Sequence, residues 1–221
     1  MLFSFLTSFS QKTTSIERIL EKTEDMNLPF YSKNIDYSKT VLLDENKVLI
    51  SLLRNNINEL YYNLQYYDND IQKNVIKQKS YKFRSVAKYS SGNIKFFIYK
   101  KSGNYSSKIF LITLNNYSIV DTLLIGYTKG ESEIVEYSES KIDNNFKITQ
   151  LKYSWNPKYS DKKLEENPDF PKSLIEIYHY IINIKTGEIT FEKKEEKYSK
   201  CYPEQFTYKN VDCELFYLDS L

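Results

Sequence analysis

Four glutamates lie close together in this sequence and are the residues best placed to do chemistry: Glu131, Glu133, Glu136 and Glu139. Two carboxylates on either side of a glycosidic bond can hydrolyse it, one as acid and the other as base or nucleophile. The same alternation of Glu with Ser and Ile is also typical of a solvated strand edge, and spacing alone does not define a site. A carboxylate-dependent hydrolase is therefore one alternative function, and no residue is assigned a catalytic role.

His179 is the only histidine of the 221 residues, and it lies between Ile177 and Ile181. No nucleophile–base pair lies near it in the sequence, which favours an ordinary half-exposed strand position over catalysis. The five glycines are scattered singly and form no phosphate-binding loop. We therefore expect a protein that is not an enzyme and that uses neither a cofactor nor a metal.

Cys201 and Cys213 are the only cysteines and are separated by eleven residues. In an exported protein they can form a disulfide that contributes about 2–3 kcal/mol by restricting the unfolded chain. The alternatives are two reduced thiols, or a metal site that would lack ligands because only one histidine is present. If the protein is exported, the disulfide is favoured.

Residues 155–173 form a long polar stretch that contains the only tryptophan and three of the five prolines. Long loops inside strand-rich domains are uncommon and often functional. Trp155, Tyr159 and Phe170 are the candidate anchors of a binding loop, since aromatic side chains dominate many interfaces. The alternative is that Trp155 covers the end of a sheet and the loop is disordered.

The chain begins with a short apolar run, residues 2–9, which ends at a polar stretch. This pattern is typical of the last part of a secretory signal peptide, with Ser8 and Ser10 available for cleavage near Gln11. The run is far shorter than the roughly 20 residues of a membrane span. Because no Lys or Arg precedes it, the true start lies upstream of Met1 or the run is simply an apolar strand or helix. We expect residues 1–11 to be a signal-peptide remnant of a periplasmic or secreted protein, with a cytoplasmic protein as the alternative.

The 31 basic and 29 acidic residues nearly balance, and the net charge of +2 predicts no attraction to nucleic acid or to a membrane surface. The chain has 21 tyrosines but only one alanine, Ala87. This bias matches AT-rich coding, so the tyrosines are not evidence for binding. We expect no nucleic-acid partner and no transmembrane segment, and the oligomeric state does not follow.

Two helices are expected near the N-terminus. Residues 14–26 carry a capping box at Thr14 and Glu17 and an apolar stripe of helical spacing. Residues 44–55 follow the N-capping Asp44 with apolar residues on one face. Residues 31–40 are expected to connect them, and residues 56–85 are ambiguous.

Seven strands are predicted from residue 93 onward by alternating apolar residues between turn signals: 94–99, 108–114, 118–125, 134–142, 146–155, 174–184 and 189–198. The short links leave no room for crossover helices, so neighbours must pair antiparallel. A two-residue turn at Thr186-Gly187 would place Ile184 opposite Ile189, and Ile182 opposite Phe191, on one apolar face.

The sequence thus predicts an α+β domain over residues 12–221. Helices within residues 12–60 are expected to pack on a twisted antiparallel meander of six to eight strands within residues 93–221. The FLTSFSQKT start resembles the signal-peptide tails of exported proteins from Bacteroidetes-type bacteria. The strands KIFLITLNNYSIVDTLLIG and IYHYIINIKTGEITFEKKEEKY are similar to those of small uncharacterised exported proteins of that group.

The resemblance implies export and assigns no catalytic residue. The function expected is binding of a protein or a cell-envelope component. The alternatives are an immunity or inhibitor protein against a toxin or hydrolase, and the hydrolase considered above.

Intact-mass measurement on fractionated cells tests both the export and the disulfide prediction. We expect the periplasmic or secreted fraction to hold a chain that begins near Gln11 and is lighter than the reduced protein by two hydrogens. A cytoplasmic protein that keeps Met1 would contradict export, and an unchanged mass after reduction would contradict the disulfide.

Overall fold

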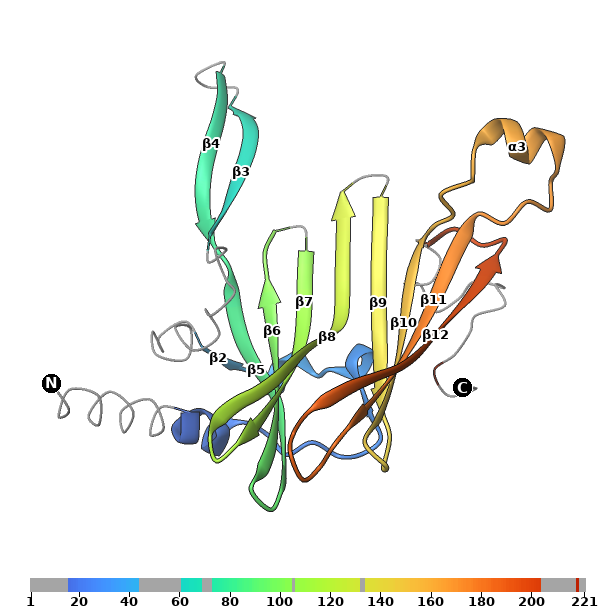
Figure 1. Cartoon of the computed structure of the whole chain (residues 1–221). Coiled ribbons are helices and arrows are strands. Elements are labelled where there is room, and N and C mark those ends of the chain that lie inside the picture. Colours follow the sequence, from blue (N-terminus) through green and yellow to red (C-terminus); the bar gives the residue numbers. More distant parts are fainter. Residues whose placement is uncertain are drawn as a thin grey trace, which may run out of the picture.

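Eight consecutive strands of the chain form an antiparallel meander in the computed structural model, which describes residues 16–43, 61–68, 73–104, 106–131, 134–203 and 218. The strands are β5 (Lys82–Ser91), β6 (Ile94–Ser102), β7 (Ser106–Asn115), β8 (Ser118–Glu131), β9 (Ile134–Ile142), β10 (Lys147–Trp155), β11 (Ser173–Ile182) and β12 (Ile189–Ser199). Two short strands, β1 (Phe30–Tyr31) and β2 (Val41–Leu42), complete a ten-stranded sheet (Figure 1). The strands β3 (Tyr61–Asp68) and β4 (Lys73–Ser80) pair only with each other.

β8 separates from β9 halfway along its length. It pairs with β7 from end to end, but with β9 only through residues 127–131. Past that point β1 lies beside β9, with Phe30 opposite Ile142. Side chains cross the gap to β8: the Ser140 hydroxyl donates to the Ile125 carbonyl at 2.5 Å, and the Gln150 amide donates to the Leu124 carbonyl at 2.6 Å. Buried carbonyls of β8 therefore stay hydrogen-bonded although the sheet opens.

The sheet curls so far that its last turn contacts β7 and β8. The Thr113 hydroxyl of β7 donates to the Gly187 carbonyl in the β11–β12 turn. The Asp121 carboxylate of β8 accepts the Ile189 N–H at 3.0 Å. These contacts join strands far apart in the strand order, and the β7–β8 and β11–β12 turns both lie at the bottom of Figure 1.

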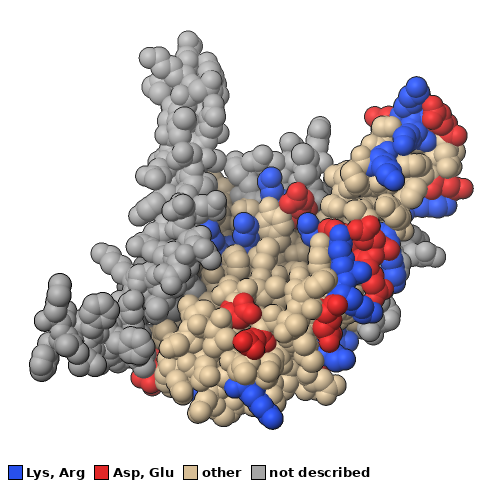
Figure 2. All heavy atoms as spheres, in the orientation of Figure 1, with Lys and Arg blue, Asp and Glu red and all other residues tan. Residues whose placement is uncertain are grey.

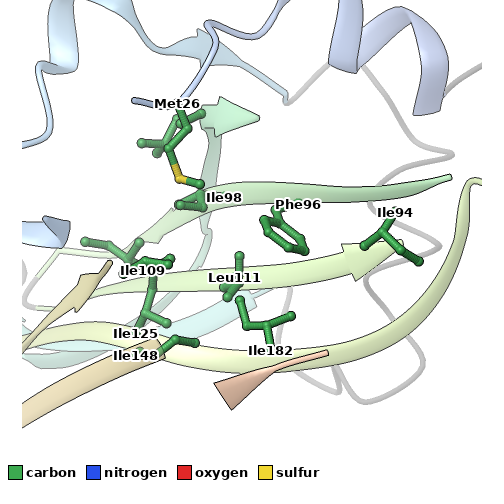
Figure 3. Packing of buried hydrophobic residues seen from close by; sticks show 12 residues of the cluster. Met26, Ile94, Phe96, Ile98, Ile109, Leu111, Ile125, Ile148 and Ile182 are labelled. Carbon is green, nitrogen blue, oxygen red and sulfur yellow. The ribbon is translucent and has the colours of Figure 1, made fainter. Parts of the chain in front are cut away.

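The main core lies inside this curl and draws side chains from β5 through β11, together with Met26 (Figure 3). Its fully buried members include Phe96, Ile98, Leu111 and Ile148. Each such side chain contributes about 1.5–3 kcal/mol by leaving water. A second cluster on β6 and β7 packs under the helix of residues 16–22, and a third on β10 and β11 includes Leu218.

The predicted helix over 14–26 ends earlier than expected, at residue 22. The Thr23 hydroxyl donates to the Ile19 carbonyl at 2.7 Å, and the Lys88 ammonium donates to the Leu20 carbonyl at 2.7 Å. The next residues run extended along β5, where the Met26 N–H donates to the Lys88 carbonyl. Hydrogen bonding to the sheet edge therefore replaces the last predicted turn. The helix predicted over 44–55 lies outside the described residues.

The antiparallel meander is confirmed, but the predicted strand count and the predicted helical cover are wrong. Within the described residues the sheet has ten strands. The prediction missed β5 because it lacks a clear strand pattern, and it missed β1 and β2 because two-residue strands carry no sequence signal. Within residues 16–43 only 16–22 form an α-helix. The remainder of that stretch is extended or in short 3₁₀ turns, and three of its side chains, Leu28, Phe30 and Ile35, pack against the main core.

The predicted register of the last hairpin is also wrong. Ile182 pairs with Ile189 and Tyr180 with Phe191, and a bulge follows in β12, so that His179 pairs with Lys193. The Asn183 side chain accepts the Lys185 N–H at 2.9 Å, which widens the turn beyond two residues. Ile182 is buried as expected, but Ile184 and Phe191 are 41% and 53% exposed.

Alanine substitutions at two glycines with positive φ can show how closely the β11–β12 turn packs on β8. Gly92 has φ 59° and open space where an alanine methyl would lie, whereas a Cβ at Gly187, with φ 86°, would lie 3.3 Å from Val120 Cγ2. We expect Gly92→Ala to lower the unfolding free energy by about 1–2 kcal/mol through backbone strain alone. Gly187→Ala should cost about 1 kcal/mol more, because it also displaces Val120.

Urea unfolding of both variants measures the difference. Adding Val120→Ala to each glycine variant should narrow the gap between them. Equal losses for the two glycine variants would show that the turn does not pack on β8.

Candidate functional site

The loop between β10 and β11, residues 156–172, projects from the end of the sheet (Figure 1). It contains a single helical segment, α3 (Asp161–Glu166), whose first turn is capped by Ser160: the Ser160 Oγ accepts the Lys163 N–H at 3.3 Å. No residue of α3 is buried. We call residues 155–173 the arm. The segment is shaped by local hydrogen bonds and not by a core of its own.

Asn156 closes the base of the arm. It is 4% exposed, its N–H donates to the Lys172 carbonyl at 2.7 Å, and its side-chain amide donates to the Pro171 carbonyl at 2.8 Å. Its side-chain oxygen accepts the Lys158 N–H at 3.0 Å. Asn156 was not among the predicted site residues, although Asn before Pro is a recognised turn signal.

Three aromatic rings meet at this base. The Trp155 ring lies 5.5 Å from Tyr159 and 5.0 Å from Tyr202, which follows β12. The Lys172 ammonium lies 4.1 Å from the centre of the Tyr202 ring. A hydrogen bond with Tyr202 raises the pKa of Tyr159 to about 12 and lowers the pKa of Tyr202. We call Trp155, Tyr159 and Tyr202 the aromatic cluster.

The structure thus brings together Trp155 and Tyr159, two of the three predicted binding residues. It adds Tyr202, which sequence reasoning did not identify. Phe170 lies elsewhere in the arm, with the Lys163 ammonium 5.2 Å from its ring. Tyr202 joins the cluster because the chain after β12 turns back along the start of β11, where the Ser173 hydroxyl donates to the Cys201 carbonyl. That return depends on tertiary contacts and leaves no local sequence signal.

The glutamates predicted as a possible catalytic pair are not placed side by side where the structure describes them. Glu136 and Glu139 occupy opposite faces of β9, since side chains alternate along a strand. The side chain of Glu131 and all of Glu133 lie outside the described part of the structure. Glu136 and Glu139 therefore do not form the carboxylate pair that hydrolysis would need.

Glu139 is a buried carboxylate with three polar neighbours. Its side chain lies 3.6 Å from the Lys33 ammonium, and the Tyr137 and Tyr153 hydroxyls donate to it at 3.1 and 3.5 Å. Burial raises its pKa, while Lys33 and the tyrosine hydroxyls act in the opposite direction. Lys33 belongs to the 3₁₀ turn η1 (Ser32–Asn34), so the pair joins the N-terminal segment to β9.

His179 lies on β11, where its Nε2 is 3.3 Å from the Glu195 carboxylate but lacks hydrogen-bond geometry. Lys193 holds the same carboxylate at 2.6 Å. The partner strand thus provides a polar cross-strand contact, the kind of arrangement that stabilises a sheet surface.

The predicted disulfide stays a prediction. No free cysteine occurs among the described residues, which include Cys201, and Cys213 lies outside them. In the described ranges no group of three or more His, Cys, Asp or Glu side chains is arranged to hold a metal ion. No helix within those same ranges has the length and apolarity needed to cross a membrane.

Comparisons of the chain with protein-family models, curated proteins and solved structures found no match.

The buried glutamate makes stability depend on pH in a defined direction. Because the pKa of Glu139 is higher in the folded chain than its usual 4.5, the folded state holds the proton more tightly than the unfolded state. This contribution is present at low pH and is lost as pH rises through the folded-state pKa. We expect the wild type to gain unfolding free energy relative to Glu139→Gln as pH falls from 7 towards 4.5.

Urea unfolding at several pH values measures this difference, with Glu192→Gln on the exposed surface of β12 as the control. A gap between wild type and Glu139→Gln that is constant with pH, or that changes in the opposite direction, would contradict the assignment.

Proposed function

We propose that this chain is an exported, non-enzymatic protein that binds another protein or a cell-envelope component through its arm. The observation that carries the proposal is the combination of a projection with no buried residue in α3 and a set of aromatic rings gathered at its base. A segment that adds little to the core but is shaped by its own hydrogen bonds is suited to contact with a partner.

The aromatic cluster has the chemistry of an interface anchor. Trp and Tyr are enriched among the residues that dominate binding energy, and rings that are already packed together lose little freedom when a partner arrives. Trp155 and Tyr159 are each only partly buried. They therefore retain surface that a partner can cover.

The charges of the arm favour a protein surface over a polyanion. Both signs are present on it (Figure 2), and the Lys200 ammonium pairs with the Asp169 carboxylate. Nucleic-acid binding relies on a surplus of Lys and Arg on one face. A mixed surface instead supports selective pairing with a partner of matched charges.

Export and the disulfide belong to the same proposal. Cys201 directly precedes Tyr202 of the aromatic cluster, and its carbonyl is already bound by Ser173. A disulfide from Cys201 to Cys213 would hold this turn of the chain, and with it Tyr202, against the base of the arm. Such a bond persists in the periplasm or outside the cell.

Site-specific photocrosslinking in producing cells tests the binding role of the arm. A benzoylphenylalanine residue at position 159 is expected to give a discrete crosslinked product in the envelope or secreted fraction, because this position borders the proposed contact. Phe191 is the matched control, since it is an aromatic residue 53% exposed near the opposite end of β12.

The product should be absent with the probe at position 191. It should also weaken when Trp155→Ala is combined with the probe at 159, in a variant whose thermal unfolding shows that it folds. The absence of any product at 159, or the same product at 191, would overturn the proposal.

A further inference from the structure

A second candidate site lies far from the arm, inside the loop formed by residues 24–39. The ends of this loop meet where the Lys39 ammonium comes within 4.0 Å of the Glu24 carboxylate. Between them the loop is fixed to two strands: the Met26 N–H donates to the Lys88 carbonyl of β5 at 2.6 Å, and β1 pairs with β9. Compact surface loops with adjoining ends are frequently functional. A cavity of about 270 Å³ lies between this loop and β5.

The cavity has an apolar lining on the side of the sheet. Val86 and Ala87 of β5 form part of it, and Met26, Phe30 and Ile35 of the loop contribute to it as well. All five belong to the main core or pack against it, so the walls are held by the fold (Figure 3 shows Met26). Such a lining favours an aliphatic chain over a hydrated ion.

The rim of the cavity is negatively charged. Three carboxylates, Glu24, Asp25 and Asp36, line it together with a single ammonium, that of Lys39. The Ser38 hydroxyl and N–H donate to one Asp36 oxygen at 2.6 and 3.0 Å and lower the pKa of Asp36, so this carboxylate is ionised at neutral pH.

The ion pair of Glu24 with Lys39 is long, with both side chains more than half exposed, and it neutralises the rim only weakly. The Lys88 ammonium lies 3.8 Å from the Asp25 carboxylate, which is 87% exposed. The three carboxylates outnumber the ammonium groups of Lys39 and Lys88 by one, so a net negative charge remains beside the cavity.

We propose that this cavity binds a primary alkylammonium group, with a short aliphatic chain on the apolar lining and its NH₃⁺ among the rim carboxylates. Each half of the ligand matches one half of the site. A carboxylate at the same place would be repelled by Asp36 and Glu24, and an alcohol could donate one hydrogen bond to a rim carboxylate but would lack the positive charge. The site is independent of the arm, so its test does not depend on the arm-binding proposal.

The composition of the chain supplies a sharp probe. Ala87 is the only alanine, and Met26 is one of two methionines, with Met1. Protein labelled with ¹³C in the alanine and methionine methyl groups therefore gives a single alanine signal, from Ala87, and a Met26 signal, and both residues line the cavity. Titration with n-pentylammonium chloride should shift both signals saturably, with a Kd on the order of 1 mM.

Two comparison ligands and two variants complete the experiment. Pentanoate and 1-pentanol, which match the probe in chain length, should produce much smaller shifts. Asp36→Asn keeps an oxygen that can accept from Ser38 but loses the charge, and should weaken pentylammonium binding about two- to five-fold. Asp169→Asn on the arm is the matched control and should bind as the wild type does.

The proposal is overturned if pentylammonium leaves the Ala87 and Met26 signals unmoved, or if 1-pentanol moves them as far at the same concentration. It is equally overturned if Asp36→Asn binds pentylammonium as tightly as the wild type.

Discussion

The separation of β8 from β9 is the constraint on which the rest of this structure depends. A flat meander of eight strands would expose one apolar face along its whole length. Because β8 stays paired with β7 but does not pair with β9 over residues 118–126, the sheet can curl until the β11–β12 turn contacts β7 and β8. The opening places backbone carbonyls in a buried position, and Ser140 and Gln150 supply the hydrogen bonds that such groups require. Two polar side chains thus allow an apolar core to be enclosed.

The same separation explains the course of the N-terminal segment. Because β8 does not pair with the end of β9, that edge of β9 is open to another strand, and β1 pairs with it there. The 3₁₀ turn that follows is held by the Ser140 N–H, which donates to the Ser32 hydroxyl at 2.8 Å, and by the pair of Lys33 with Glu139. A segment that leaves a helix at residue 22 can therefore cross to β9 and return to β5 as β2. Its passage creates the cavity under residues 24–39.

The two candidate sites differ in their relation to the core. The arm stands outside the core, and its shape comes from Asn156 and the Ser160 cap, so contact with a partner need not disturb the sheet. The cavity is built on residues that also belong to the core, and its rim carries the charge. A large, adaptable contact suits the first, and a small ligand with one charged end suits the second.

The strands from residue 94 onward were predictable from the sequence, because alternation and turn residues are local signals that tertiary contacts reinforced. Trp155 and Tyr159 were also recognisable as a candidate pair, since they stand in a long polar loop. The register of the last hairpin was not predictable from its turn dipeptide, because the side chain of Asn183 competes for the backbone and lengthens the turn. β5 was not predictable either, because its mixture of small, basic and aromatic residues lacks a clean alternation.

By itself the sequence determined an antiparallel meander, a long polar loop that carries Trp155, Tyr159 and Phe170, and a chain whose basic and acidic residues nearly balance. Only the tertiary structure decided where Tyr202, Glu139 and Met26 lie, since each acquires its neighbours from strands or segments distant in the chain. Local patterns specify which face of a strand is apolar. They do not specify how a sheet bends, and the bend is what brings these residues to their sites.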